Sequence, residues 1–325
     1  MFIGLKPSQV IYMKKIWFAG TYLLVLVFLA GMFAGCAGEA AEDTGEQKIG
    51  VVVSILPQAE FAERVGGDRI MVTVMVPPGG SPHTYEPTPR QLEEVSRAKI
   101  YAKVGSGIEF ELVWTDKIIS VNSKILVVDC SSGINLIESA DNSEHEGEHG
   151  ELNEEEFTGE RTYHNYNPHI WLSPANAKIM VENIYSGLIE ADPDGRNFYY
   201  DNKVNFQNEL DELDNEIRKI LSGKENRKIL VYHPAWTYFA RDYHLEQIII
   251  EKEGKEPTAE GIRNLISQAK LYNIKLIFAS PELSVKSAET IAREIGGSVV
   301  LISPLEKDYL ANMRKAAEAF GQALE

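Results

Sequence analysis

The sequence predicts an α/β protein of two similar lobes, each with a mostly parallel sheet, joined by one long helix. Short runs rich in Val and Ile alternate with helical patterns, and near-continuous apolar runs are typical of parallel strands covered on both faces. The runs fall into two sets of four, with a long helical pattern between the sets. The predicted strands are residues 49–55, 70–76, 99–105, 124–129, 228–233, 245–250, 275–280 and 298–303.

Helix starts between these strands carry their own signals. Thr88 is followed directly by Pro89 and, three residues after the threonine, by Gln91. This pattern predicts an N-cap, a proline at the first helical position and a capping box. The cap-then-proline pattern recurs at Ser173 and Pro174, which predicts a second helix start.

A long amphipathic helix is predicted between the two sets of strands. Apolar residues recur there at spacings of four, three, four and three, which places them on one stripe of an α-helix. They are Phe206, Leu210, Leu213, Ile217 and Ile220. A helix of about 25 residues ending near Gly223 is about 37 Å long, enough to serve both lobes as a stiff spine. The stripe alone also fits a surface helix of the second lobe.

The N-terminal segment reads as an export signal. Lys14 and Lys15 precede an apolar run over 16–34 that ends shortly before Cys36. This layout predicts a lipoprotein signal in which Cys36 is lipidated, or an uncleaved anchor of marginal length for a bilayer. Either interpretation places the rest of the chain outside the cytoplasmic membrane, held at its outer face or periplasmic. The expected parts are a signal segment at 1–36, a flexible tether at 37–47, an N-terminal lobe at 48–192, a linker helix at 193–223 and a C-terminal lobe at 224–325.

Composition limits the classes of function. The 48 acidic and 32 basic side chains give a net charge of -16, which repels nucleic-acid phosphates and attracts cations. Two cysteines are too few for an all-thiolate metal site, so His and carboxylates must hold any bound metal. We therefore expect a chain that binds a divalent cation and no nucleic acid. We also expect it to be a monomer.

Three of the seven histidines stand where a ligand cleft is expected. His83 lies in a Pro- and Gly-rich loop after a predicted strand, His169 precedes a helix, and His233 ends a strand. Open α/β sheets bind ligands beyond the carboxyl ends of their strands, so a cleft between the lobes could unite the three imidazoles. Such a set suits zinc. Each histidine taken singly fits a capping or loop role as well, and spacing alone does not establish a metal site.

The segments around these histidines resemble the metal-ligand segments of the zinc/manganese substrate-binding lipoproteins of metal ABC importers, cluster A-I of the periplasmic solute-binding proteins. They are PPGGSPHTYEPTP (77–89), NPHIWLSP (167–174) and HPAWTYFARDYHL (233–245), and segments 254–270 and 280–296 resemble that family's C-terminal lobe. The resemblance implies metal held between two lobes by His83, His169 and His233. It also implies Zn²⁺ as the transported ligand, release to a permease with its ATPase, and no catalytic role.

The fourth ligand position departs from that family's pattern. Relatives commonly carry Asp in an Asp-Pro-Leu turn, whereas this chain has Ser303, and Pro82 stands where some zinc members have Glu. Three neutral imidazoles leave the charge of an ion without a compensating anion. We expect water or hydroxide at the fourth position, with Ser303 as the second choice and Glu282 as the third. The lack of a carboxylate favours Zn²⁺ over Mn²⁺.

Residues 141–164 form an acidic segment with three histidines. It holds nine acidic residues together with His145, His149 and His164, and it has almost nothing apolar to bury. It reads either as a solvated surface insert or as a low-affinity collector that raises the local concentration of divalent cations. Zinc members of the resembled family often carry such a loop at this place, which favours zinc.

Other classes of function stay open at this point. Three histidines and a water also compose a catalytic zinc site. A three-His zinc hydrolase is therefore the alternative function in the enzyme class. Glu86, close to His83, is the only candidate general base near the histidines in the sequence. The same binding role for Mn²⁺ is another alternative, and a surface adhesion or metal-storage protein is a third.

Overall fold

A computed structural model describes residues 48–139, 166–251 and 254–325 of the chain. The predictions for the segment 1–47, including Cys36, and for the acidic segment with its three histidines lie outside the described residues. Within the described ranges, none of the helices has the length and apolarity needed to cross a bilayer.

The N-terminal lobe is built on a four-stranded sheet. Its strands are β1 (Ile49–Val53), β2 (Ile70–Val74), β3 (Ile100–Lys103) and β4 (Leu126–Asp129). They are parallel and lie in the order β2-β1-β3-β4, so the first strand is interior. The valines of β1 are buried, as expected for a strand covered on both faces.

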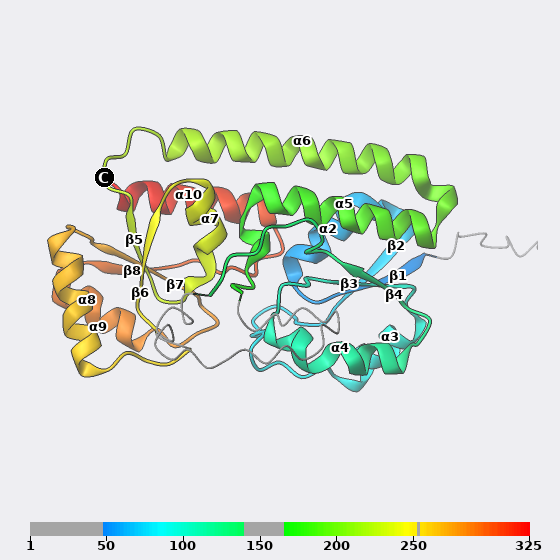
Figure 1. Ribbon diagram of the computed structural model, residues 1–325, viewed down its shortest axis with the longest axis horizontal. Coiled ribbons are helices and arrows are strands. Elements are labelled where there is room, and N and C mark those ends of the chain that lie inside the picture. Colours follow the sequence, from blue (N-terminus) through cyan, green and yellow to red (C-terminus); the bar gives the residue numbers. More distant parts are fainter. Residues whose placement is uncertain (1–47, 140–165, 252–253) are drawn as a thin grey trace, which may run out of the picture. The chain divides into compact units, whose positions relative to one another are not determined.

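Helices cover both faces of this sheet, as Figure 1 shows. The helices α2 (Leu56–Gly66) and α5 (Pro174–Ala191) lie on one face and pack against each other. The other face carries α3 (Pro89–Arg97) and α4 (Glu109–Val121). Both predicted cap-then-proline starts open helices here, α3 and α5.

The start of α3 anchors the loop that carries His83. The backbone N–H of Gln91 donates to Thr88 Oγ1 at 3.3 Å, and the N–H of Thr88 donates to Gln91 Oε1 at 2.9 Å, which confirms the capping box. The Gln91 amide also donates to the carbonyls of Val74 at 2.9 Å and Met75 at 2.7 Å. One side chain therefore holds both ends of the loop together.

The C-terminal lobe repeats the arrangement. Its strands are β5 (Lys228–Val231), β6 (Glu246–Ile249), β7 (Leu276–Ala279) and β8 (Ser298–Leu301). They are parallel in the order β6-β5-β7-β8, which is the order of the first lobe. This repetition confirms the predicted class of two similar α/β lobes.

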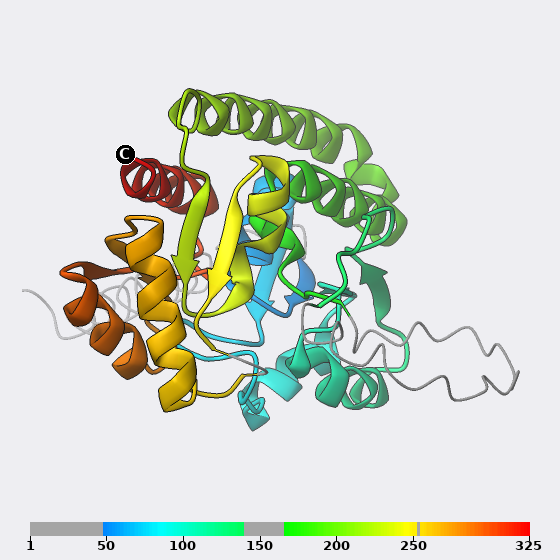
Figure 2. The same cartoon turned by 60° about the vertical axis from the view of Figure 1, so that its left-hand side comes forward.

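The second sheet is also covered on both faces (Figure 2). The helices α8 (Ala259–Leu271) and α9 (Lys286–Ile295) close one face over a separate apolar core. On the other face lie α10 (Tyr309–Ala323) and the short α7 (Thr237–Asp242). This second face shares its core with the N-terminal lobe, so one apolar cluster extends through both lobes.

The long predicted helix is α6 (Arg196–Ile220), 25 residues in length. Phe206, Leu210, Leu213 and Ile217 on its stripe are all fully buried. The helix contacts α2 and α5 of the first lobe and α10 of the second, and it runs along these helices in Figures 1 and 2. It therefore bridges the lobes, and the alternative of a surface helix of the second lobe alone is wrong.

An aromatic cluster ties α10 to the second sheet. The buried ring of Phe320 lies 4.7 Å from the ring of Phe278 on β7 and 5.2 Å from those of Trp236 and Phe239, measured between ring centroids. Trp236 and Phe239 follow His233 closely in sequence, so this packing also supports the segment that carries that histidine.

Candidate metal centre

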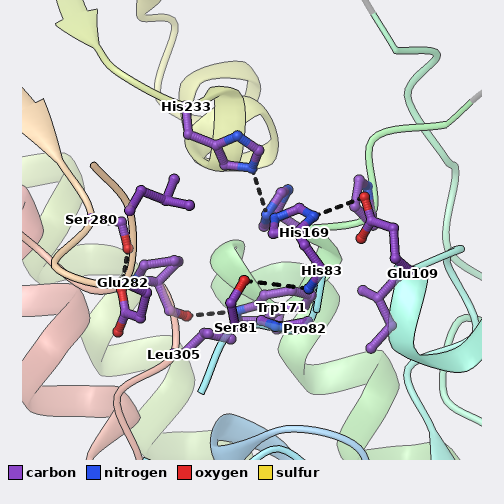
Figure 3. A pocket seen from close by; sticks show the side chains of 14 residues that line it. Ser81, Pro82, His83, Glu109, His169, Trp171, His233, Ser280, Glu282 and Leu305 are labelled. Carbon is purple, nitrogen blue, oxygen red and sulfur yellow. Dashed lines mark hydrogen bonds and ion pairs between the residues drawn. The ribbon is translucent and has the colours of Figure 1, made fainter. Parts of the chain in front are cut away.

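The structure brings His83, His169 and His233 to one pocket between the lobes (Figure 3). His83 lies in the loop after β2, His169 directly precedes a short 3-10 helix that leads to α5, and His233 follows β5. The ring centroid of His233 lies 4.9 Å from that of His169 and 5.4 Å from that of His83. Positions far apart in sequence thus converge because His83 and His233 follow strands whose ends face each other and His169 stands at a helix start beside them.

The pocket is small. Its cavity volume is about 30 Å³, and its lining includes the three histidines, Glu109, Glu282 and the buried ring of Trp171. A cavity needs about 10–15 Å³ of space open to a water-sized sphere to hold one water, so this one has room for a single ion or for one or two waters. The indole of Trp171 donates to the carbonyl of Pro304 at 2.7 Å, which joins the two lobes beside the pocket.

Each of the three imidazoles has its Nδ1 atom against an oxygen. His83 Nδ1 lies 2.9 Å from Glu109 Oε1, and His233 Nδ1 lies 2.5 Å from Glu251 Oε1. His169 Nδ1 lies 3.1 Å from Asn167 Oδ1. An ionised carboxylate only accepts hydrogen bonds, so the protons of His83 and His233 belong on Nδ1.

The tautomer of His169 follows from the orientation of the Asn167 amide. Asn167 Nδ2 donates to the carbonyl of Pro234 at 2.8 Å, and Asn167 Oδ1 accepts from the backbone N–H of His169 at 3.1 Å. These two contacts fix which end of the amide is the oxygen. The oxygen therefore faces His169 Nδ1, which must carry the proton, and Nε2 is the free donor atom of all three rings.

Two of these Nε2 atoms face each other. His169 Nε2 lies 3.2 Å from His233 Nε2. With both Nδ1 atoms protonated, two Nε2 lone pairs meet at this distance, which is unfavourable unless a proton or a metal cation lies between them. Two nitrogens bound to a tetrahedral zinc at 2.0–2.1 Å lie about 3.3–3.4 Å apart, close to this spacing.

The rings differ in exposure and in charge. His83 has a side chain that is 33 % exposed, and His169 is buried at 6 %. The hydrogen bond with Glu109 raises the pKa of His83, although burial opposes this. Burial lowers the pKa of His169 well below its ordinary value, and the charges of the two neighbouring histidines act in the same direction. His169 is therefore neutral near pH 7, which is the form that ligates a metal.

Glu109 and Glu251 are the residues that the sequence analysis missed. Burial alone would raise the pKa of Glu109, but the hydrogen bond and charge of His83 lower it overall. Glu109 begins α4 and Glu251 closely follows β6, so both lie where ligands gather in such sheets. The strand-end argument used for the histidines would have found them. The expectation that Glu86 is the only carboxylate near the histidines is wrong, since Glu86 is exposed and does not line the pocket.

The structure places Ser303 beside the pocket rather than in its lining. Ser303 Oγ donates to Glu282 Oε1 at 2.5 Å and accepts from the backbone N–H of Leu305 at 3.0 Å. Its hydroxyl faces an adjoining cavity of about 90 Å³. Glu282 lines both cavities and accepts a second hydrogen bond from Ser280. Of the two side chains considered for a fourth ligand, only Glu282 thus reaches the histidine pocket.

The rings meet without forming a finished coordination sphere. Among residues 48–139, 166–251 and 254–325, no three His, Cys, Asp or Glu side chains are already grouped closely enough to hold an ion. Because two Nε2 atoms are already near the spacing of zinc ligands, we expect only the rings and their loops to shift on binding.

Comparison with known proteins identifies the family. Residues 51–323 match the family model for ZnuA, the zinc-uptake complex component A, periplasmic. The high-affinity zinc uptake system protein ZnuA of Bacillus subtilis (strain 168) is 28% identical over 299 residues, which cover 90% of each chain. Zinc-binding protein AdcA of Streptococcus pyogenes serotype M3 is 28% identical over 309 residues, and the match spans 91% of this chain but 60% of AdcA.

Solved structures agree. A crystal structure of ZnuA is 38% identical and superposes with a TM-score of 0.75 over 86% of this chain and 100% of that chain. A zinc-bound deletion mutant of ZnuA is also 38% identical, with a TM-score of 0.75 over 85% of this chain and 98% of that one. The resemblance noted in the sequence is confirmed. The chain belongs to the family of periplasmic component A proteins of zinc-uptake complexes.

Proposed function

We propose that this chain captures one Zn²⁺ ion outside the cytoplasmic membrane and delivers it to the permease of an ABC importer. The ion is cargo, held by the Nε2 atoms of His83, His169 and His233. The observation that carries the proposal is the 3.2 Å approach of two Nε2 atoms whose rings both present Nδ1 to an oxygen. That arrangement turns two Nε2 atoms toward one point, and its spacing suits zinc.

The donor set favours zinc over manganese. Three neutral imidazoles are borderline-soft ligands, whereas Mn²⁺ prefers carboxylate and water oxygens. The two carboxylates nearest the rings, Glu109 and Glu251, are bound to Nδ1 atoms. For the fourth position we propose water, with Glu282 as the alternative. Ser303 ranks last, because its hydroxyl is engaged with Glu282 and Leu305.

A catalytic role has little support. A zinc hydrolase needs a free base within reach of the metal-bound water. Glu109 and Glu251 are committed to imidazoles, and Glu282 accepts hydrogen bonds from Ser280 and Ser303. Glu86 is exposed outside the pocket lining. The family and the relatives compared above carry names of transport and binding proteins.

Titration of the full chain with Zn²⁺ and Mn²⁺ tests the proposal. We expect one tight zinc site per chain by calorimetry, with weaker binding of manganese. Zinc at 100 times its Kd stabilises the folded chain by about 2.7 kcal/mol, since only the folded state binds. For a protein of this size that raises the Tm by about 5–10 °C, and a chelator should reverse the shift. Several tight zinc sites per chain, or no shift in Tm with zinc, would contradict the proposal.

The remaining assignments concern attachment and partners. We propose that the chain is a monomer at the outer face of the membrane, or periplasmic, held by a lipid on Cys36 or by the uncleaved segment. The permease and its ATPase are the proposed receivers of the ion. Mass spectrometry of the N-terminus of the mature chain would distinguish lipid from anchor.

We further propose that residues 141–164 collect zinc at low affinity for the cleft. Deleting them is expected to slow zinc uptake by cells when zinc is scarce and to leave the Kd of the cleft nearly unchanged. The ZnuA deletion mutant named above is zinc-bound. This supports the idea that such proteins still bind zinc after an internal segment has been deleted. Calorimetry and uptake of radioactive zinc measure the two effects. An equal loss of affinity and uptake would instead make the segment a source of primary ligands.

A further inference from the structure

We propose that Glu109 and Glu251 are positioning residues that select the Nδ1-protonated form of His83 and His233 and neutralise the charge of the bound ion. This inference rests on the proposed function, because it assigns roles around the same ion. Each lobe supplies one imidazole–carboxylate pair, and the pairs meet across the pocket.

The geometry of the two pairs is alike. Glu109 Oε1 lies 2.9 Å from His83 Nδ1, and Glu251 Oε1 lies 2.5 Å from His233 Nδ1. A carboxylate at Nδ1 holds the proton there, fixes the plane of the ring and leaves Nε2 to bind the metal. The side chain of Glu251 is 9 % exposed, so its charge is poorly solvated without its histidine.

The backbone around Glu109 is fixed by a second carboxylate. Glu111, two residues further on, is buried and accepts the N–H groups of Val104 at 2.5 Å and Gly105 at 2.8 Å. These bonds tie the first turn of α4 to the end of β3. Glu109 is therefore presented to His83 from a rigid helix start rather than from a loose loop.

The two pairs also account for charge. Zinc carries two positive charges, and three neutral imidazoles supply none to offset them. The two carboxylates add two negative charges in direct contact with two of the ligands. The third ligand, His169, is oriented by the neutral amide of Asn167. The oriented set thus balances the charge of the ion without placing a carboxylate on it.

Replacement of each carboxylate separates its two roles. Glu109→Gln and Glu251→Gln keep the shape of the side chain and an oxygen acceptor but remove the charge. Glu109→Leu and Glu251→Leu remove the charge and the oxygen acceptor together. Loss of such an outer partner lowers metal affinity about 10–100-fold, so we expect the Gln variants near the lower value and the Leu variants near the upper one. Glu86→Gln and Glu86→Leu are the matched controls, since Glu86 is exposed in the His83 loop.

The measurements are calorimetric zinc titration of each full-chain variant and long-range proton–nitrogen NMR of the zinc-loaded protein. The spectra should show Nδ1 protonated and Nε2 on the metal for His83 and His233. The Nδ1–H signal of His83 should move upfield in Glu109→Gln with that of His233 unchanged, and the reverse should hold in Glu251→Gln. Unchanged Tm values without zinc show that the variants fold.

The outcomes separate the two proposals. A wild-type chain that binds no zinc overturns the proposed function itself. A wild-type chain that binds one zinc while the Gln and Leu variants bind as tightly as the Glu86 controls overturns only the role of the carboxylates. Metal on Nδ1 of either ring also overturns it, because the carboxylate and the metal cannot share that atom.

Discussion

Alanine at His83, His169 or His233 is expected to weaken zinc binding by about 100- to 1,000-fold. Zinc sites with four ligands are worth about 10–16 kcal/mol in total, which is roughly 3 kcal/mol for each ligand. We expect the largest loss at His169, which is buried and lies beside His233 at 3.2 Å between Nε2 atoms. The smallest is expected at His83, whose side chain is 33 % exposed, because water can replace it most easily. Calorimetric titration of the three variants measures the order.

The control for these variants is His244→Asn. His244 is exposed and has a positive φ of 56°, a conformation that Asn tolerates better than Ala. Its zinc affinity should equal that of the wild type. If His169→Ala binds zinc as tightly as this control, the three imidazoles are not the site.

Phe320→Ala is expected to cause the largest loss of stability, about 3–5 kcal/mol of unfolding free energy. Its ring is fully buried and contacts Trp236, Phe239 and Phe278, so alanine leaves a cavity that four elements line. The Tm should fall by about 10 °C or more. Urea and thermal unfolding without zinc measure both quantities.

Phe198→Ala is the matched control, since Phe198 on α6 is 40% exposed. It removes the same atoms from a site where water already reaches the ring, and it should cost much less. Equal losses in the two variants would mean that α10 is not packed as the aromatic cluster indicates.

The fold could be predicted because its signals are local. Each strand is a short apolar run. Because these strands are buried on both faces, they lack the alternating polar residues of half-exposed strands, and the apolar run is easy to recognise. The helix α6 is predicted by its apolar stripe of Phe206, Leu210, Leu213 and Ile217. Its bridging role was predicted from its length, but the stripe alone could not exclude a surface helix of the second lobe, because the deciding contacts involve α10, about a hundred residues further along the chain.

The site was predictable only in part, for a related reason. The three histidines stand at strand ends or just before a helix, and their neighbouring residues resemble a known family. Glu109 lies 26 positions from His83, and Glu251 lies 18 from His233. The pairing of a histidine with a carboxylate depends on which strands are neighbours in the sheet and on the direction in which a helix begins. Ser303 shows the same limit, since a short hydroxyl serves whichever carboxylate the fold brings to it, here Glu282.

The amide of Asn167 has a mechanical consequence. Its oxygen orients the ring of His169, and its nitrogen donates a hydrogen bond to the carbonyl of Pro234 in the opposite lobe. Pro234 directly follows His233 in the sequence. A hinge motion that moves Pro234 away breaks this hydrogen bond and allows the amide to rotate. The ring of His169 then loses the oxygen that orients it and can rotate as well. Separation of the two lobes and release of a bound ion are thus coupled through the hydrogen bonds of this amide, so a docking partner that separates the lobes need not touch the ion.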